Sequence, residues 1–302
     1  MAERILENVE LCRARENGML MSPTMVKGTD CMLWFMYHYI DKVVTKPTRA
    51  LLMGSLFDHF CETNGHLLPY NDFKDLSTPD MDIVIKAFER YRPHIDYDND
   101  AFQMLVWAHV AEGVYLHGYL DIVKQHTDIR PDFIGDDVNE PGYIGTCSYI
   151  IDKVIDTKFT LKKLKPSRTK KDGTPSYDAK EGWKQQGRHY IWLLQQMGYK
   201  HIDSIQFDVM NAEDDELIQI VYKPKQISVD NVRAEVIAAW LKIEHAKLHN
   251  DYVATVDWRC KWGDGPEEQC DYYETCSAQK LLAKAKQEQD AIMTDYNPEL
   301  DG

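Results

Sequence analysis

The spacing of apolar residues along the chain changes near residue 131, and this change limits the folds that the chain can adopt. Before that point, apolar residues recur at helical spacing in MLWFMYHYI, ALLMGSLFDHFCE and FQMLVWAHVAEGVYLHGYLDIV. After it, GYIGTCSYII and KVIDTKFTL are rich in β-branched and aromatic residues, and we expect them to pair as a hairpin around Asp152. The sequence therefore predicts a helical N-terminal part followed by a sheet.

The remaining segments alternate between helix and strand. The amphipathic segment GWKQQGRHYIWLLQQMGY ends near Gly198, as helices often do, and the strand candidates SIQFDVMNA and ELIQIVYKP precede a helix over 229–249. This order predicts an α/β (α+β) fold with a mixed central sheet flanked by helices. We expect one domain over 1–302, divided into a helical part (1–126), a core (127–250) and a Cys-containing segment with a helical tail (251–302).

The composition narrows the classes of function. Lys and Arg number 35 against 49 Asp and Glu, and the net charge of -14 argues against a protein that coats nucleic acid through a general positive field. No apolar stretch approaches the roughly 20 residues of a membrane span, so we expect a soluble, cytoplasmic protein without membrane association. Seven cysteines without a secretory signal indicate free thiols or metal ligands rather than disulfides.

One local run departs from the acidic average. The segment LKKLKPSRTKKDG carries six basic residues, which are Lys162, Lys163, Lys165, Arg168, Lys170 and Lys171. Composition alone indicates a solvated loop. Its place directly after the strongest catalytic candidate favours a second interpretation, in which these residues contact DNA.

That candidate is the pair Asp156 and Lys158, which one residue separates within an expected strand, so that both side chains point to one face. A carboxylate can hold a hard divalent cation, and a neighbouring ammonium can orient or deprotonate a water or offset charge on a phosphate. The spacing by itself is equally typical of a surface pair on an ordinary strand.

The segments around this pair are a more specific signal than the pair itself. The segments MGSLFDHF, GTCSYIID and VIDTKFT, followed by a helix with Gln186 and Tyr190, together resemble the RecB-type PD-(D/E)xK nucleases. That group includes CRISPR-associated adaptation nucleases and many phage exonucleases. The resemblance spans roughly residues 20–280. It implies a restriction-endonuclease-like core, Mg²⁺ or Mn²⁺ as cofactor, and hydrolysis of DNA in phage recombination or repair.

The resemblance also implies roles for individual residues. Asp156 corresponds to a metal-binding carboxylate and Lys158 to the catalytic lysine. Gln186 and Tyr190 correspond to the family's Q-x-x-x-Y element, and their spacing puts both on one helical face. Without the preceding strand, they would be interpreted as a surface glutamine and a half-buried tyrosine.

Upstream, the family has a glycine, three further residues and a metal-binding histidine. Here Gly54 is followed at that spacing by Asp58, and His59 comes one residue later. Asp58 is the first choice as a ligand and His59 the second. Because consecutive helical residues lie about 100° apart, we expect only one of them to face the metal.

The strand before Asp156 departs from the family pattern G-x-x-D, because the matching stretch Gly145-Thr-Cys-Ser148 ends in serine. A hydroxyl is a poor replacement for a carboxylate toward magnesium. Three explanations stay open: a natural inactive member, a deliberately disabled form, or a ligand supplied from elsewhere. Gly118-Tyr-Leu-Asp121 also fits the pattern, but it lies in a segment of helical periodicity and ranks below Ser148.

The cysteines suggest a second metal centre. Several RecB-like nucleases hold a [4Fe-4S] cluster with one N-terminal and three C-terminal cysteines, and thiolates suit such clusters. Cys31, Cys260, Cys270 and Cys276 resemble that arrangement. The long spacing between Cys260 and Cys270 keeps open the alternative that they are ordinary thiols.

Three functions are consistent with these patterns. The first is a divalent-metal-dependent deoxyribonuclease, exonucleolytic by resemblance, that acts on single strands or duplex ends, with a homo-oligomer or a recombination protein as further partners. The second is an inactive protein of the same fold that binds DNA ends or a protein, and Ser148 favours it. The third is a thiol-metal protein unrelated to nucleases.

Overall fold

The computed structural model describes residues 20–43, 45, 47–66, 73–128, 148–212, 216–253 and 276. The chain forms two compact units. The first contains residues 1–23 and 47–234, and the second contains residues 24–46 and 235–302. Within the described residues, no helix is long and apolar enough to cross a membrane.

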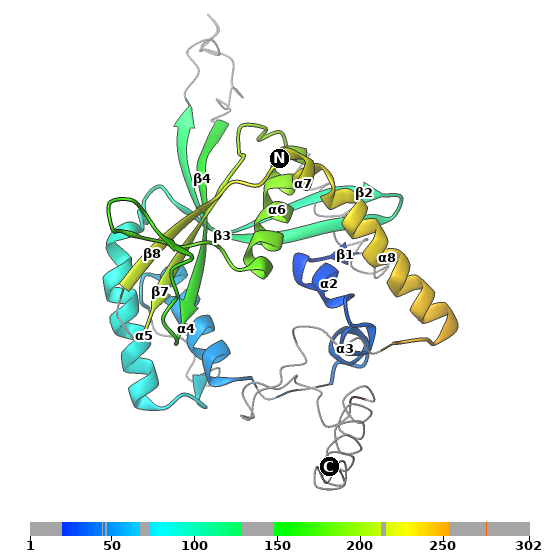
Figure 1. The fold of residues 1–302 in the computed structure, drawn as a ribbon, viewed down its shortest axis with the longest axis horizontal. Coiled ribbons are helices and arrows are strands. Elements are labelled where there is room, and N and C mark those ends of the chain that lie inside the picture. The colour runs from blue at the N-terminus through cyan, green and yellow to red at the C-terminus, as the bar shows by residue number, and fades with distance from the viewer. Residues whose placement is uncertain are drawn as a thin grey trace, which may run out of the picture. The chain divides into compact units, whose positions relative to one another are not determined.

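The first unit is built on a sheet of six strands (Figure 1). They are β1 (Leu20–Met21), β2 (Ala101–Ala111), β3 (Val114–Asp128), β4 (Ser148–Thr160), β7 (Ile205–Asn211) and β8 (Glu216–Tyr222). The order is β1-β3-β4-β7-β8, with β2 also paired to β3. The pairs β1–β3 and β4–β7 are parallel and the others antiparallel, so the sheet is mixed.

Strands β2 and β3 form one long hairpin, and the helix predicted there is wrong. Ala111 pairs with Val114, so Glu112 and Gly113 form a two-residue turn, and Gly113 takes the positive φ of 70° that such turns need. Val106 and Val110, which alternate along β2, are fully buried. Burial thus follows a period of two, and the N-terminal part is not helical throughout.

The hairpin predicted around Asp152 is also wrong, because β4 runs without reversal from Ser148 to Thr160. Its antiparallel partner is β3. Lys124 pairs with Lys153, but Gln125 pairs with Ile151, so Asp152 is an extra residue in β4. A β-bulge accommodates such a residue without turning the strand.

Helices cover both faces of the sheet, as neighbouring residues of β7 show. A Cβ added to Gly187 of α6 (Glu181–Gln196) would lie 3.3 Å from the ring of Phe207, so this face of β7 packs against α6. The next residue, Asp208, instead accepts a hydrogen bond from Tyr91 of α5 (Thr78–Tyr91). Consecutive strand residues point to opposite faces, so the predicted α/β class with a mixed, helix-flanked sheet is confirmed.

The main core lies between the sheet and two helices, α4 (Arg49–Thr63) and α5. Hydroxyls cap both helices. The Thr48 hydroxyl accepts a hydrogen bond from the backbone N–H of Leu51, and the Ser77 hydroxyl accepts one from the backbone N–H of Asp80. The buried side chains that join these helices to the sheet are Met53, Phe57, Tyr91, Ile122, Ile155 and Met210. This packing fixes α4 against β4.

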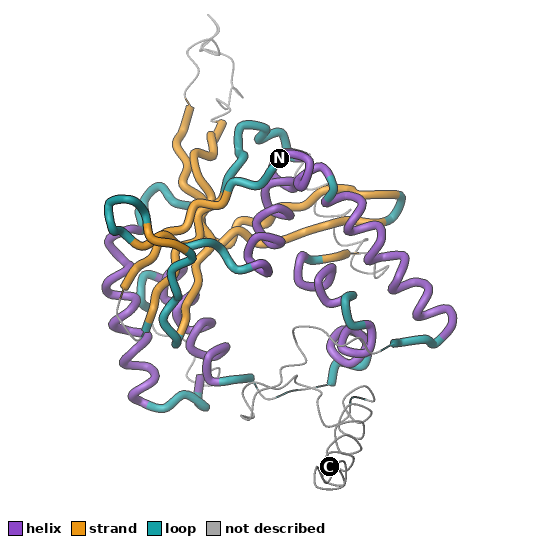
Figure 2. Tube along the Cα trace, in the orientation of Figure 1, coloured by secondary structure: helices purple, strands orange, loops and turns teal. Residues whose placement is uncertain are grey.

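The other elements are short or belong to the second unit. The first unit also contains the turn η3 (Arg92–His94), the small hairpin β5 (Arg168–Thr169) and β6 (Pro175–Ser176), and α7 (Gln226–Asp230). Most of α2 (Pro23–Gly28), all of α3 (Met32–Phe35) and η1 (Met36–Ile40), and most of α8 (Val232–His249) belong to the second unit. Figure 2 distinguishes these helices from the strands of the sheet.

Candidate functional site

Two strands bring Asp121 and Asp156 together. The ladder between β3 and β4 pairs Ile122 with Ile155, and the next position in the same register would set Asp121 opposite Asp156. Residues opposite each other in an antiparallel pair share a face. Asp121, the second choice for the G-x-x-D carboxylate, therefore lies at the place that was assigned to Ser148.

Asp156 is a buried carboxylate with few polar partners inside the protein. Its side chain is 1% exposed and forms an ion pair with the ammonium of Lys158. Apart from that ion pair, neither carboxylate oxygen has a hydrogen-bond partner among the described residues. A buried carboxylate with so few partners is costly, so this site has unused capacity for a ligand.

Asp208, one strand away, shows how a buried carboxylate is normally satisfied. It accepts hydrogen bonds from Tyr91 at 2.7 Å, from Gln206 at 2.5 Å and from Gln219 at 3.2 Å. Its side chain is as buried as that of Asp156. The contrast singles out Asp156 as the buried acid whose oxygens are left for another partner.

Asp58 joins the cluster from α4 through Thr157. The Thr157 hydroxyl lies 2.8 Å from Oδ1 of Asp58 and 3.2 Å from Oδ2 of Asp121. The backbone N–H of Thr157 also donates to Oδ2 of Asp121 at 2.9 Å. Carboxylates from α4, β3 and β4 therefore converge around a single residue.

Burial and the neighbouring charge of Asp121 make Asp58 and Asp156 hard to ionise. Burial and the charge of Asp121 raise the pKa of Asp58 to about 7, although the hydrogen bond from Thr157 lowers it. Burial also raises the pKa of Asp156 to about 7, with Lys158 acting in the opposite direction and Asp121 in the same one. A bound cation would relieve both effects.

Lys158 is held in its charged form. Burial alone would lower its pKa, but the charges of Asp156 and Asp121 outweigh burial and raise the pKa above its usual value. The side chain keeps 21% of its surface exposed. Lys158 is therefore an ammonium at neutral pH, suited to donate hydrogen bonds and to offset negative charge.

Gln186 and Tyr190 of α6 lie beside this cluster. The Gln186 amide donates a hydrogen bond to the Tyr190 hydroxyl at 2.9 Å. Burial and the charges of Asp156 and Asp121 raise the pKa of Tyr190, so it stays neutral. The Tyr190 ring packs over Gly118, where an added Cβ would lie 2.5 Å from Cε1. Glycine at 118 is thus required by the ring of the Q-x-x-x-Y element.

The donor chemistry fits a hard divalent cation. Asp58, Asp121 and Asp156 offer oxygen ligands, which Mg²⁺ and Mn²⁺ prefer, and the ion pair with Lys158 leaves the oxygens of Asp156 with spare capacity. In the metal-free arrangement of the described residues, no three or more Asp, Glu, His or Cys side chains lie where they could together hold a metal ion. The remaining positions would then fall to water, backbone oxygen or substrate, as is usual for magnesium.

Two predicted residues lie apart from the cluster. Ser148 pairs with Asp128, and 156 − 148 = 8 residues of the same strand separate it from Asp156, a span of roughly 25 Å. The assignment of Ser148 as the partner of Asp156 is therefore wrong, because it depended on the hairpin. His59 lies against the Phe60 ring, whereas Asp58 is the residue bonded to Thr157.

The basic residues come shortly after the site along the chain. All six are exposed and follow β4, through β5 and into the turn after it. They are Lys162, Lys163, Lys165, Arg168, Lys170 and Lys171. Gly173 has a φ of 84°, which allows the chain to reverse its direction in that turn. The first of them comes four residues after Lys158.

The cysteine prediction is only partly within the described residues. Cys31 and Cys276 are buried and free of disulfides, and both belong to the second unit. Cys260 and Cys270 lie outside the described residues. The iron-sulfur cluster therefore stays a prediction.

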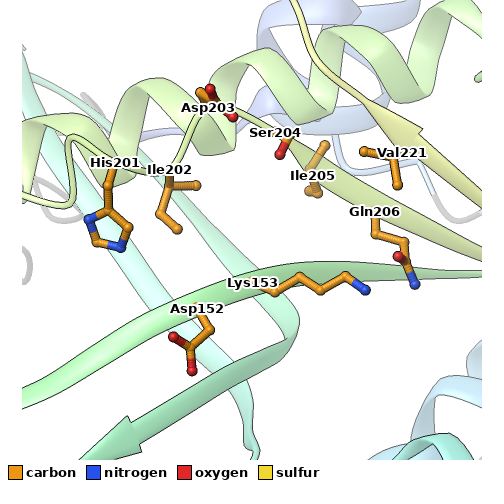
Figure 3. Close-up of a pocket in the computed structure, with 9 residues that line it drawn as sticks. All are labelled: Asp152, Lys153, His201, Ile202, Asp203, Ser204, Ile205, Gln206 and Val221. Carbon is orange, nitrogen blue, oxygen red and sulfur yellow. The ribbon is translucent and has the colours of Figure 1, made fainter. Parts of the chain in front are cut away.

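A pocket of ≈ 230 Å³ lies at the other end of β7 (Figure 3). Lys153, Ser204 and Gln206 line it, together with His201, whose Nε2 lies 2.7 Å from the carbonyl oxygen of Ile151. None of the three clustered carboxylates lines this pocket. It is thus separate from the candidate site.

Sequence reasoning missed Thr157 and ranked Asp121 too low. The Glu112-Gly113 turn and the alternating burial on either side of it were the available signals for a strand at Asp121. No sequence signal identified Thr157, because its role depends on α4 lying against β4.

Comparison with known proteins gives one informative likeness. The crystal structure of a candidate exonuclease from Eubacterium rectale superposes with a TM-score of 0.51 at 12% identity, covering 79% of this chain and 85% of that one. A second structure, SSO0001, covers 91% and 97% at 11% identity, but its TM-score of 0.36 carries no argument. No family model and no curated sequence matches the chain. The first likeness shows a shared fold.

Proposed function

We propose that this chain is a divalent-metal-dependent nuclease that hydrolyses phosphodiester bonds of DNA. The observation that carries the proposal is the buried Asp156 carboxylate, which lies beside Asp121 and has an ion pair with Lys158 as its main compensation among the described residues. The fold shared with a candidate exonuclease is consistent with it. The finer assignment to the RecB-type PD-(D/E)xK group belongs to the same proposal.

Asp121, Asp156 and Asp58 would hold Mg²⁺ or Mn²⁺. When bound, such an ion supplies an acidified water and neutralises charge on the phosphate and the leaving oxygen. The three acids come from a helix and two strands that the core fixes, so their backbone positions are set before an ion binds. The raised pKa values of Asp58 and Asp156 mean that the ion competes with protons below neutral pH.

Lys158 would act as a cation rather than as a base. Its raised pKa keeps the ammonium charged, so it can orient a water by donating to it and can offset charge on the scissile phosphate. Gln186 holds the neutral Tyr190 hydroxyl beside the acids. Tyr190 would thereby orient Lys158 or a phosphate oxygen.

The basic residues after β4 would contact the DNA backbone. A net charge of -14 leaves no general attraction for DNA, so local cations must provide it. The exposed lysines Lys170 and Lys171 occupy the turn of the β5–β6 hairpin. Replacing both by alanine should weaken DNA binding and reduce its salt dependence.

The alternative of an inactive DNA-binding protein has lost its supporting observation. It depended on serine in place of a metal-binding aspartate, and Ser148 lies far from Asp156 along β4. Asp121 supplies a carboxylate at that place.

Incubation of purified protein with labelled single-stranded and duplex DNA tests the proposal. We expect cleavage with Mg²⁺ or Mn²⁺, none in EDTA, and a loss of about 100-fold or more in Asp156→Asn, the scale of removing one charge-stabilising group. Lys158→Met tests the role of Lys158 in the same assay. Its matched control is Lys153→Met, because Lys153 is an exposed lysine on the same strand. Wild-type protein that cuts neither substrate with either ion would refute the nuclease proposal.

A further inference from the structure

Thr157 lies between the two residues of the D-x-K pair and is not itself part of the proposed ligand set. Its side chain is 3% exposed. Strand alternation turns it to the opposite face from Asp156 and Lys158, toward α4. Any role of Thr157 in assembling the metal site rests on the proposed function.

The contacts of Thr157 join two acids from different elements. Its hydroxyl lies 2.8 Å from Asp58 and 3.2 Å from Asp121. A hydroxyl carries one proton, so it donates to one carboxylate at a time. The backbone N–H of Thr157 gives Asp121 a second donor at 2.9 Å.

We propose that Thr157 is a positioning residue that keeps Asp58 and Asp121 close together, so that both can turn toward a divalent cation. Two carboxylates this close repel each other, as the effect of Asp121 on Asp58 shows. The shared hydroxyl opposes that repulsion before a cation binds. Thr157 does not touch the reacting atoms, and its effect acts through the two acids.

The residue type suits this role. A β-branched side chain has few rotamers, so a buried threonine in a strand presents its hydroxyl in one direction. Groups that orient metal ligands typically change metal affinity 10- to 100-fold when removed. Valine keeps the shape of threonine and removes only the hydroxyl donor.

The strand offers a matched control. The Thr160 hydroxyl is buried and has no hydrogen-bond partner among the described residues. Thr160→Val therefore removes the same chemical group from the same strand without breaking a bond. Thr157→Ser keeps the donor and tests rescue, and Thr157→Cys, a weaker donor, replaces Thr157→Val if that variant does not fold.

The test is the Mn²⁺ dissociation constant of each full-length variant, measured by titration calorimetry. We expect Thr157→Val to bind Mn²⁺ about tenfold or more weakly, with Thr157→Ser and Thr160→Val close to wild type. At saturating Mn²⁺, kcat should be largely retained, so the loss appears in metal affinity rather than in turnover.

The outcomes separate this inference from the proposed function. If Thr157→Val, or Thr157→Cys in its place, binds Mn²⁺ as the wild type does, the positioning role is refuted while the nuclease proposal stands. An equal loss in Thr160→Val would also refute it, because the effect would then be a general response of the strand. If the wild type itself binds no Mn²⁺, both proposals fail.

Discussion

The carboxylate of Asp121 accepts a hydrogen bond from the backbone N–H of Thr157 at 2.9 Å. This bond connects β3 to β4 one residue beyond the last ladder pair, Ile122 and Ile155. Because this donor is backbone, the position of Asp121 depends on the sheet as well as on the Thr157 hydroxyl. Asp121 is thus the best-fixed acid of the cluster, and Asp58 is the one that relies on the hydroxyl.

Gly118→Ala should destabilise the protein and displace Tyr190. The new Cβ would lie 2.5 Å from the tyrosine ring, and overpacking of this kind costs about 1–3 kcal/mol. Urea unfolding measures the change. Gly54→Ala is the control, because nothing lies within 4 Å of its added Cβ and alanine favours a helix by about 1 kcal/mol over glycine. Equal effects at the two positions would contradict the packing of Tyr190 on Gly118.

The metal-free protein should lose stability as pH rises from about 4 to about 7. Asp58 and Asp156 have pKa values of about 7 in the folded state against 3.8 ordinarily, so the folded state binds their protons more tightly. That stability is complete below pH 3.8 and is lost as pH rises through the folded value. The free energy of unfolding in EDTA, measured at several pH values, tests this.

Added Mn²⁺ should reverse the trend, because the ion binds the ionised acids and stabilises more as pH rises. Asp156→Asn should flatten the pH profile in EDTA, since asparagine does not titrate. A profile in which Asp156→Asn and wild type fall equally between pH 4 and 7 would show that these acids are not the cause.

Tyr91→Phe should cost about 1.5–3 kcal/mol, because it removes a donor from the buried Asp208 carboxylate. Tyr97→Phe is the matched control: its hydroxyl donates to the neutral carbonyl of Cys61, a bond worth about 0.5–1.5 kcal/mol. Chemical denaturation of both variants gives the comparison. If Tyr97→Phe is the more damaging change, the Asp208 network contributes less than its geometry indicates.

Anaerobically purified protein should contain iron and show broad visible absorbance if the four cysteines hold a [4Fe-4S] cluster. Cys276→Ser should lose both signals. Cys61→Ser should keep them, because Cys61 packs in α4 of the first unit and is not among the four. Wild-type protein without iron or zinc would leave Cys31 and Cys276 as ordinary buried thiols.

Four residues predicted for the site lie near one another, although the strands around them were partly predicted wrongly. The resemblance to a family pattern grouped Asp156, Lys158, Gln186 and Tyr190, since the spacing of Asp156 and Lys158 alone is equally typical of a surface pair. Asp121 was undervalued because the apolar residues of β2 and β3 match a helical period by chance. The prediction of Ser148 failed because a bulge at Asp152 has the same local signature as a turn. Thr157 could not be predicted, since its partner Asp58 is 99 residues away.

The central claim is that Asp121, and not position 148, completes the site with Asp156 and Lys158. The rate of Mn²⁺-dependent cleavage of labelled DNA by wild type, Asp121→Asn and Ser148→Asp tests it in one assay. We expect the wild type and Ser148→Asp to cut at equal rates and Asp121→Asn to be about 100-fold or more slower. A wild type that does not cut beside a Ser148→Asp variant that does would contradict the claim.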